Sequence, residues 1–286
     1  MAHADSGGVR IFYEITEGRG DDPRTVVLVQ GLGLSSRFWF EQPELLAADP
    51  RGPRRIIVLD NRGTGRSDRP TGPYNMRMLA RDVVAVLDAA GCERATLVGV
   101  SMGGMIAQRV AMHHPDRVDG LVLLATLPGL PHSRLPSART LGLLLSMPLQ
   151  NKSRTSRAHN RLLLPEKELD RAAHHFAKWP AAIAHDPLRA RTFASQFAAI
   201  ATNWTGDLHK HIACPTMIVS GAEDILVPPD NGRRLAARIK HSRYELLADV
   251  AHAVPLLDRD VVARSLRSLA EMAASIAAGE VAARGL

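Results

Sequence analysis

The sequence predicts an α/β protein in which a mostly parallel central sheet is flanked by helices and interrupted by a helical insertion. The first observation is that short apolar runs alternate with helical stretches near both ends of the chain. The second is that this alternation stops between about residues 127 and 212, where no strand-like run occurs. The length of 286 residues suits one large domain of this kind with an insertion.

The first part of the chain, 1–127, contains four predicted strands, each a short apolar run bounded by turn residues. These runs cover 25–30, 56–60, 95–100 and 118–125. Two helices are predicted between them, over 76–90 and 103–114, from apolar residues at helical spacing. Pro115 ends the second helix.

The middle part, 128–213, is rich in Arg, His and Ala with scattered Pro, and it predicts a helical cap. Within it, 141–147 and 193–201 are typical of amphipathic or buried helices. The sheet pattern resumes in 214–286, with strands predicted over 215–220 and 243–247. The last 25 or so residues predict an Ala-rich helix.

The composition is that of an ordinary globular protein, with 45% apolar and 23% charged residues. No apolar run approaches the roughly 20 residues that span a bilayer. The segment 1–8 lacks the apolar core of a signal peptide. Cys92 and Cys214 fit no metal or redox spacing, so we expect reduced core cysteines in a cytoplasmic protein with no membrane partner.

The formal charge is +7, and the middle part accounts for it, with 12 Lys and Arg against 5 Asp and Glu in 128–213. A basic protein can bind nucleic acid, but no nucleic-acid motif occurs and aromatic residues make up only 4%. A solvated basic surface is the favoured interpretation. The alternative is that the cap attracts an anionic small-molecule substrate or an acidic carrier protein.

The pentapeptide Gly99-Val100-Ser101-Met102-Gly103 joins a predicted strand to a predicted helix. Such a turn raises the serine into the open, and its glycines remove side chains where strand and helix crowd each other. The helix that follows directs free N–H groups toward developing negative charge. A chance glycine-rich turn is the alternative, but the flanking elements favour Ser101 as a catalytic nucleophile.

A serine hydroxyl needs a base to take its proton, and histidine titrates near neutrality. His252 is the best candidate among twelve histidines because it follows the last predicted strand, after the serine and the acid in chain order. The other eleven lie in the cap, in the N-terminal tail, at a helix end or before a strand.

The third member of such a site is a carboxylate that orients the histidine. Asp224 lies four residues beyond the strand predicted over 215–220, and the Ile-Leu-Val-Pro run after it would anchor its loop. Glu223 competes with it, Asp230 and Asp249 are weaker candidates, and Asp224 could simply make local turn hydrogen bonds.

An oxyanion hole needs two preorganised N–H donors. We expect one from Met102 and the other from Leu32, with Gly33 as the alternative for the second. Gly31 and Gly33 would bring this loop close to the substrate. Trp179 and Trp204 are candidates for an apolar acyl pocket, although packing between cap and core is the simpler role for each.

These features together resemble the α/β-hydrolase superfamily, particularly its small bacterial esterase and lactonase-like members with a helical cap. The matching motifs are the loop after the first strand (30–33), Asp60 to Ser67, the Ser101 pentapeptide, His114 to Val118, Gly221 to Pro228, and Ala251-His252. Two positions depart from the family pattern: Gln30 replaces the usual His before Gly31, and Ala251 replaces the Gly that commonly precedes the base. Related dehalogenases and epoxide hydrolases use an aspartate nucleophile, so Ser101 argues against both activities.

The sequence therefore predicts a serine hydrolase that cleaves an ester, lactone or thioester through an acyl-serine intermediate, with no cofactor or metal. The same site could instead cleave a carbon–carbon bond, transfer the acyl group to another acceptor, or act as a cyclase or lyase. A non-catalytic binding module is also possible on this fold. The sequence carries no signal for the oligomeric state or for the identity of the substrate.

Overall fold

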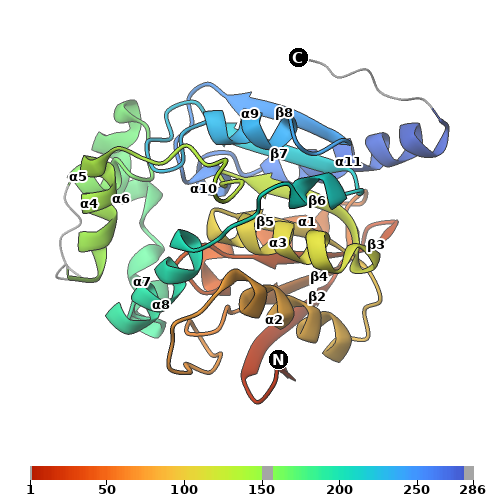
Figure 1. The fold of residues 1–286 in the computed structure, drawn as a ribbon, viewed down its shortest axis with the longest axis horizontal. Helices are drawn as coiled ribbons and strands as arrows, with labels where there is room; N and C mark the ends of the chain where they lie inside the picture. The colour runs from red at the N-terminus through yellow and green to blue at the C-terminus, as the bar shows by residue number, and fades with distance from the viewer. Residues whose placement is uncertain (1, 150–156, 280–286) are drawn as a thin grey trace.

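A computed structural model describes residues 2–149 and 157–279 of the chain. Its centre is an eight-stranded sheet with the strand order β1-β2-β4-β3-β5-β6-β7-β8 (Figure 1). The strands are β1 Ala2–Asp5, β2 Arg10–Glu17, β3 Asp22–Val29, β4 Pro53–Leu59, β5 Ala95–Val100, β6 Val118–Leu124, β7 Thr216–Gly221 and β8 Ser242–Leu247. All neighbouring pairs from β4 to β8 are parallel, and β1 and β2 pair antiparallel at one edge.

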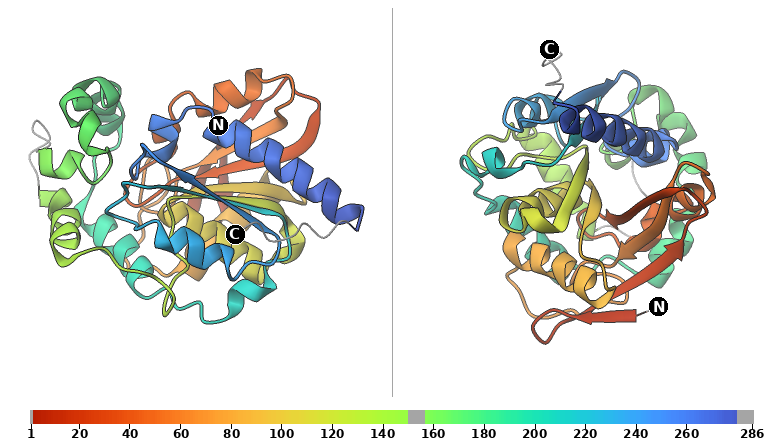
Figure 2. Two further views of the ribbon diagram at one scale, coloured as in Figure 1. Left: turned by 90° about the horizontal axis from the view of Figure 1, so that it is seen from above. Right: turned by 90° about the vertical axis from the view of Figure 1, so that its right-hand side faces the viewer.

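Helices cover both faces of this sheet, as the two views of Figure 2 show. The helices outside the middle part are α1 Gln42–Ala48, α2 Met76–Ala89, α3 Met102–His113, α9 Asp230–Ala236, α10 Val254–Leu257 and α11 Val261–Ala277. The α/β fold predicted from the alternation of apolar runs and helical stretches is confirmed.

The central strands are buried on both faces because their apolar residues alternate between two cores. In β3, Val27 and Val29 belong to the core under α2 and α3, whereas Val26 and Leu28 belong to the core under α1 and α11. This double burial explains why such strands appear in the sequence as continuous apolar runs.

In the described residues of the middle part of the chain, between β6 and β7, helices joined by loops replace the strands of the sheet. Its helices are α4 Ala138–Ser146, α5 Arg157–Asn160, α6 Ala172–His175, α7 Trp179–His185 and α8 Ala190–Ala201. Figure 1 shows α4 to α6 beyond one end of the sheet, with α7 and α8 nearer to it. The cap boundaries at 128 and 213 stay predictions.

The sequence analysis missed the N-terminal hairpin of β1 and β2. β1 has no apolar run, and β2 carries charged residues at both ends with only Ile11, Phe12 and Tyr13 buried. Edge strands often contain charged residues, which hide them from a search for apolar runs. The predicted C-terminal helix exists as α11, and its expected continuation over 280–286 lies outside the described residues. None of the described helices is long and apolar enough to cross a membrane.

Candidate active site

Ser101 occupies the turn between β5 and α3 in a conformation that a non-glycine residue rarely adopts, with φ 55° and ψ −118°. The crowding there requires glycine on both sides. A Cβ at Gly99 would lie 2.3 Å from the carbonyl oxygen of Gly103, and one at Gly103 would lie 2.0 Å from that of Val29. The Ser101 N–H donates to the Leu124 carbonyl at 2.9 Å, which holds the strained turn against β6.

His252 and Asp224 come together from two loops that follow β8 and β7. The Nδ1 atom of His252 lies 2.7 Å from Oδ2 of Asp224. The other carboxylate oxygen accepts the N–H groups of Leu226 at 2.9 Å and Val227 at 2.7 Å. These bonds fix the carboxylate, so the sequence expectation that the Ile-Leu-Val-Pro run anchors this loop matches the geometry.

The other carboxylates that were considered from the sequence make no such contact with His252. Their side chains lie at the surface of the fold, where each pairs with a basic residue. The pairs are Glu223 with Arg161 at 3.7 Å, Asp230 with Arg134 at 3.3 Å, and Asp249 with Lys167 at 2.8 Å.

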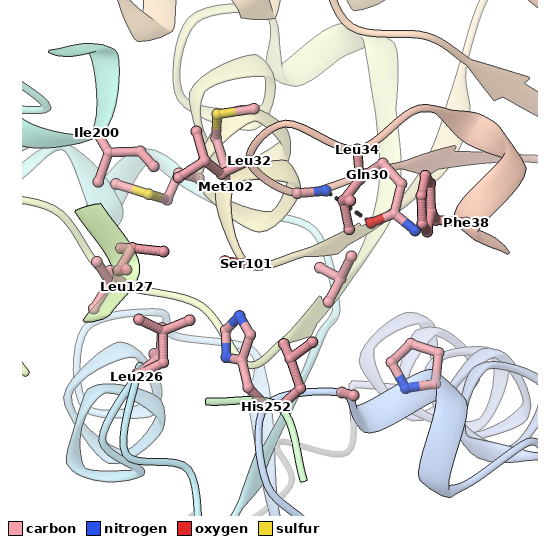
Figure 3. Close-up of a pocket in the computed structure, with 18 of the residues that line it drawn as sticks. Gln30, Leu32, Leu34, Phe38, Ser101, Met102, Leu127, Ile200, Leu226 and His252 are labelled. Carbon is pink, nitrogen blue, oxygen red and sulfur yellow. Dashed lines mark hydrogen bonds between the residues drawn. The ribbon is translucent and has the colours of Figure 1, made fainter. Parts of the chain in front are cut away.

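Ser101 and His252 line one cavity of about 520 Å³. Figure 3 shows the imidazole of His252 turned toward Ser101. No hydrogen bond joins these two described side chains in the structure, and such bonds are often long before substrate binds. With Nδ1–H directed at Asp224, the free nitrogen of His252 is Nε2, which is the basic position in this tautomer.

Leu32 and Met102 line the same cavity beside Ser101. Within the described residues, neither backbone N–H has an acceptor in the protein. The alternative donor, Gly33, is already engaged, since its N–H donates to Oε1 of Gln196 at 2.8 Å. Gly31 lies directly against the nucleophile, because a Cβ there would be 3.3 Å from Cβ of Ser101.

Gln30, which replaces the histidine usual in this family, turns its side chain back onto its own loop. Its Oε1 accepts the N–H of Gly31 at 2.8 Å (dashed in Figure 3). The Gln30 backbone carbonyl in turn accepts Nδ2 of Asn61 at 2.9 Å. The substitution therefore keeps a side chain that stabilises the loop.

The cavity wall is mostly apolar and comes from both the sheet core and the middle part of the chain. It includes Phe38, Leu144, Trp179, Phe193, Phe197 and Leu226. Trp179 packs edge-on against Phe38, with ring centroids 5.0 Å apart. Trp204 does not contribute to the cavity: its side chain is 65% exposed, so the sequence-based assignment of Trp204 to the pocket is wrong.

The described basic residues of the middle part are not among the residues that line this cavity. Among the Lys and Arg residues of 128–213 that the structure describes, none is part of the cavity wall. Several of them pair with acidic residues instead: Arg157 with Asp170, Arg171 with Glu168, and Lys178 with Glu41. Among the described residues, the charged ones in the wall are Glu41 and Arg259. No cluster of His, Cys, Asp and Glu able to hold a metal ion occurs in the described part of the chain.

Comparison with known proteins places this geometry in a family. The family model described as alpha/beta hydrolase fold matches residues 24–258. A relative from Caulobacter sp. (strain K31), named "Putative carbamate hydrolase RutD", is 32% identical over 248 residues, which are 82% of this chain and 86% of that protein.

Solved structures of similar fold include Est816, described as an N-acyl homoserine lactone degrading enzyme. It is 26% identical, with a TM-score of 0.72 over 93% of this chain and 99% of that one. The enol-lactonase from Burkholderia xenovorans LB400 is 24% identical, with a TM-score of 0.79 over 94% of this chain and 99% of that one. The chain belongs to the alpha/beta hydrolase fold family and is a hydrolase.

Proposed function

We propose that this hydrolase cleaves an uncharged ester, lactone or thioester with an apolar acyl group, through an acyl-serine intermediate. One observation carries the proposal: Ser101 and the His252–Asp224 pair meet at a single apolar cavity. A cavity of about 520 Å³ accommodates a small molecule, and its wall favours an apolar one.

In the proposed reaction, Nε2 of His252 takes the proton of Ser101 while Oγ attacks the substrate carbonyl carbon. The N–H groups of Leu32 and Met102 stabilise the oxyanion. The protonated His252 then gives its proton to the leaving oxygen or sulfur as the bond to the acyl carbon breaks. A water molecule, deprotonated by His252, attacks the acyl-serine and releases the acid with Ser101 restored.

Asp224 supports this reaction from behind the imidazole. Its carboxylate holds Nδ1–H and stabilises the imidazolium that forms when His252 accepts the proton. Because Leu226 and Val227 bind the second carboxylate oxygen, Asp224 is preorganised for this role.

A carbamate is a second candidate substrate, and the similarity to the RutD relative favours it. The same attack on a carbamate carbonyl would form a carbamoyl-serine. The size and apolar wall of the cavity favour a larger acyl group than a simple carbamate carries.

Two measurements test the proposal. A fluorophosphonate probe should label wild-type protein at Ser101 and fail to label Ser101→Ala. Hydrolysis of p-nitrophenyl esters of increasing chain length should then be compared with that of a matched carbamate and of a monoester of a dicarboxylic acid. We expect the neutral esters to be preferred, with rates that vary less than about twofold with salt, because a neutral substrate has no charge to screen.

Retention of full turnover by Ser101→Ala would contradict the nucleophilic mechanism. The absence of label on wild-type protein would favour a cyclase or lyase without an acyl-enzyme. Product analysis separates hydrolysis from acyl transfer to another acceptor and from carbon–carbon cleavage. A strong preference for the dicarboxylate monoester that weakens with salt would support an anionic substrate instead.

A further inference from the structure

Four consecutive residues, 31–34, form the loop that offers a backbone N–H to the proposed oxyanion. Three of its N–H groups have acceptors within the protein. Gly31 donates to Oε1 of Gln30 at 2.8 Å, Gly33 to Oε1 of Gln196 at 2.8 Å, and Leu34 to the Gly31 carbonyl at 3.4 Å. Leu32 is the exception within this described loop. The amides on both sides of Leu32 are thus bound by glutamine side chains.

Gln196 reaches this loop from α8, in the middle part of the chain, and its side chain is fully buried. Its Nε2 donates to the Arg62 carbonyl at 3.0 Å while its Oε1 accepts from Gly33. If the Gln196 amide were rotated by 180°, its Nε2 would face the Gly33 N–H and its Oε1 would face the Arg62 carbonyl, so neither hydrogen bond could form. Both ends of the amide are therefore fixed by the neighbouring backbone.

An apolar contact also joins the loop at 31–34 to the middle part of the chain, next to the Gln196 hydrogen bond. Gly33 has φ +74°, and a Cβ there would lie 2.5 Å from Cδ1 of Leu188. The segment just before α8 therefore packs directly on the loop. The position of this loop depends on the middle part of the chain as well as on the sheet.

We propose that Gln196, together with Gln30, is a positioning residue that fixes the loop so that the Leu32 N–H is left for the substrate oxyanion. This inference rests on the proposed function, in which Ser101 generates that oxyanion. Donors stabilise a transition state best when they are held in place before the reaction. A displacement of about 1 Å at such a site can lower the rate by about 100-fold.

The test replaces Gln196 with Met, which has a similar length but can neither accept from Gly33 nor donate to Arg62. We expect kcat to fall by about tenfold or more, while KM changes by less than about threefold, because the oxyanion forms only after attack. The affinity for a trifluoromethyl ketone, whose adduct with Ser101 carries an oxyanion, should fall in parallel with kcat/KM.

Thr192→Val is the matched control. Thr192 is buried on the same helix, and its Oγ1 donates to the Gly63 carbonyl at 3.0 Å, so it also joins α8 to the core. Thr192 is not one of the residues that line the cavity, and its hydroxyl bonds to Gly63, outside the loop at 31–34. We expect Thr192→Val to keep kcat within about twofold, while the midpoint of its urea denaturation falls because the Gly63 carbonyl loses its donor.

Gln196→Glu provides a readout that a purely structural role would not produce. A protonated glutamate can accept from Gly33 and donate to Arg62, whereas an ionised one faces the Arg62 carbonyl without a proton. The kcat of this variant relative to wild type should therefore rise as the pH is lowered from 8 to 6. Should Gln196→Met not fold, this pH dependence alone decides the question.

Failure of this inference is distinguishable from failure of the proposed function. If the fluorophosphonate does not label wild-type Ser101, the proposed function is wrong and the positioning role falls with it. Suppose instead that wild type is labelled and turns over substrate. If Gln196→Met then has the kcat of wild type, and the kcat of Gln196→Glu relative to wild type does not change between pH 8 and 6, only the positioning role is overturned.

Discussion

The Nδ1 atom of His252 lies 2.7 Å from Oδ2 of Asp224, and both side chains are buried. Their positions are 28 residues apart in the sequence, on loops after two neighbouring strands of the sheet. The carboxyl ends of parallel strands lie at one edge, so these two loops and the turn after β5 meet there. This pair is the most directly testable part of the site.

Replacing Asp224 with Asn should lower kcat by about 10⁴-fold with little change in KM, because the amide no longer holds Nδ1–H or stabilises the imidazolium. Steady-state kinetics on a p-nitrophenyl ester measure this. Glu223→Gln is the control, since Glu223 pairs with Arg161 and should leave kcat within about twofold. A large loss in Glu223→Gln with none in Asp224→Asn would reverse the assignment.

The strained turn at Ser101 predicts a difference in stability between two variants that lack the serine hydroxyl, Ser101→Gly and Ser101→Ala. Glycine adopts a positive φ without the steric cost that alanine bears, although it has more conformational entropy to lose on folding. We expect Ser101→Gly to have a free energy of unfolding about 1 kcal/mol higher than that of Ser101→Ala. Urea denaturation measures this difference, and equal stability of the two variants would show that the turn stores no strain.

The crowding around the turn predicts that Gly103→Ala destabilises the protein. The new Cβ would start 2.0 Å from the Val29 carbonyl oxygen, so the helix or β3 has to shift, at a cost of about 2 kcal/mol or more. Gly142→Ala in α4 is the control, because nothing lies within 4 Å of its Cβ position. Alanine should stabilise that helix by about 0.5–1 kcal/mol. Thermal unfolding of both variants checks this contrast. A melting temperature of Gly103→Ala equal to that of wild type would refute it.

His209 predicts a loss of stability in mild acid. Its pKa is lowered to about 4, mainly by burial and in addition by the charges of His132, Arg238 and Arg109. The unfolded chain, with a pKa near 6.5, takes up a proton first, so the free energy of unfolding should fall as the pH drops from about 6.5 to about 4. The total contribution is on the order of 3 kcal/mol.

The matched variant for this test is His209→Gln. The Nε2 of His209 donates to Oε1 of Gln108 at 3.0 Å, and a glutamine amide can make the same bond without titrating. Denaturation across this pH range should therefore show a shallower slope in the variant than in wild type. Identical slopes would place the acid sensitivity in other groups.

The strand-to-helix turn at Ser101 could be predicted because its signals are local. The pentapeptide, the apolar run before it and the helical spacing after it all lie within 20 residues. Chain order and the turn after β7 pointed to His252 and Asp224, and the structure brings these two side chains into contact. The N-terminal hairpin escaped prediction because its edge strands carry charge instead of an apolar run.

Contacts between side chains that lie far apart in the sequence could not be predicted from the sequence. Gly33 and Gln196 are 163 residues apart, and no local pattern marks a glutamine in an amphipathic helix as the acceptor for a distant amide. The same holds for Trp204, whose aromatic ring suggested a pocket although its position on the fold leaves it exposed.

The sequence by itself determined the order of strands and helices, the strand-to-helix turn at Ser101, and which residues follow the carboxyl ends of the strands. Backbone preference and apolar periodicity are properties of short segments, so they can be read directly from the sequence. Only the tertiary structure decided that Asp224 and none of its competitors contacts His252. It also decided that the Gly33 N–H donates to Gln196, that the Leu32 N–H has no acceptor among the described residues, and that the described cavity wall is mostly apolar despite the basic middle part. Those outcomes depend on distances between segments far apart in the chain, which packing sets and composition does not.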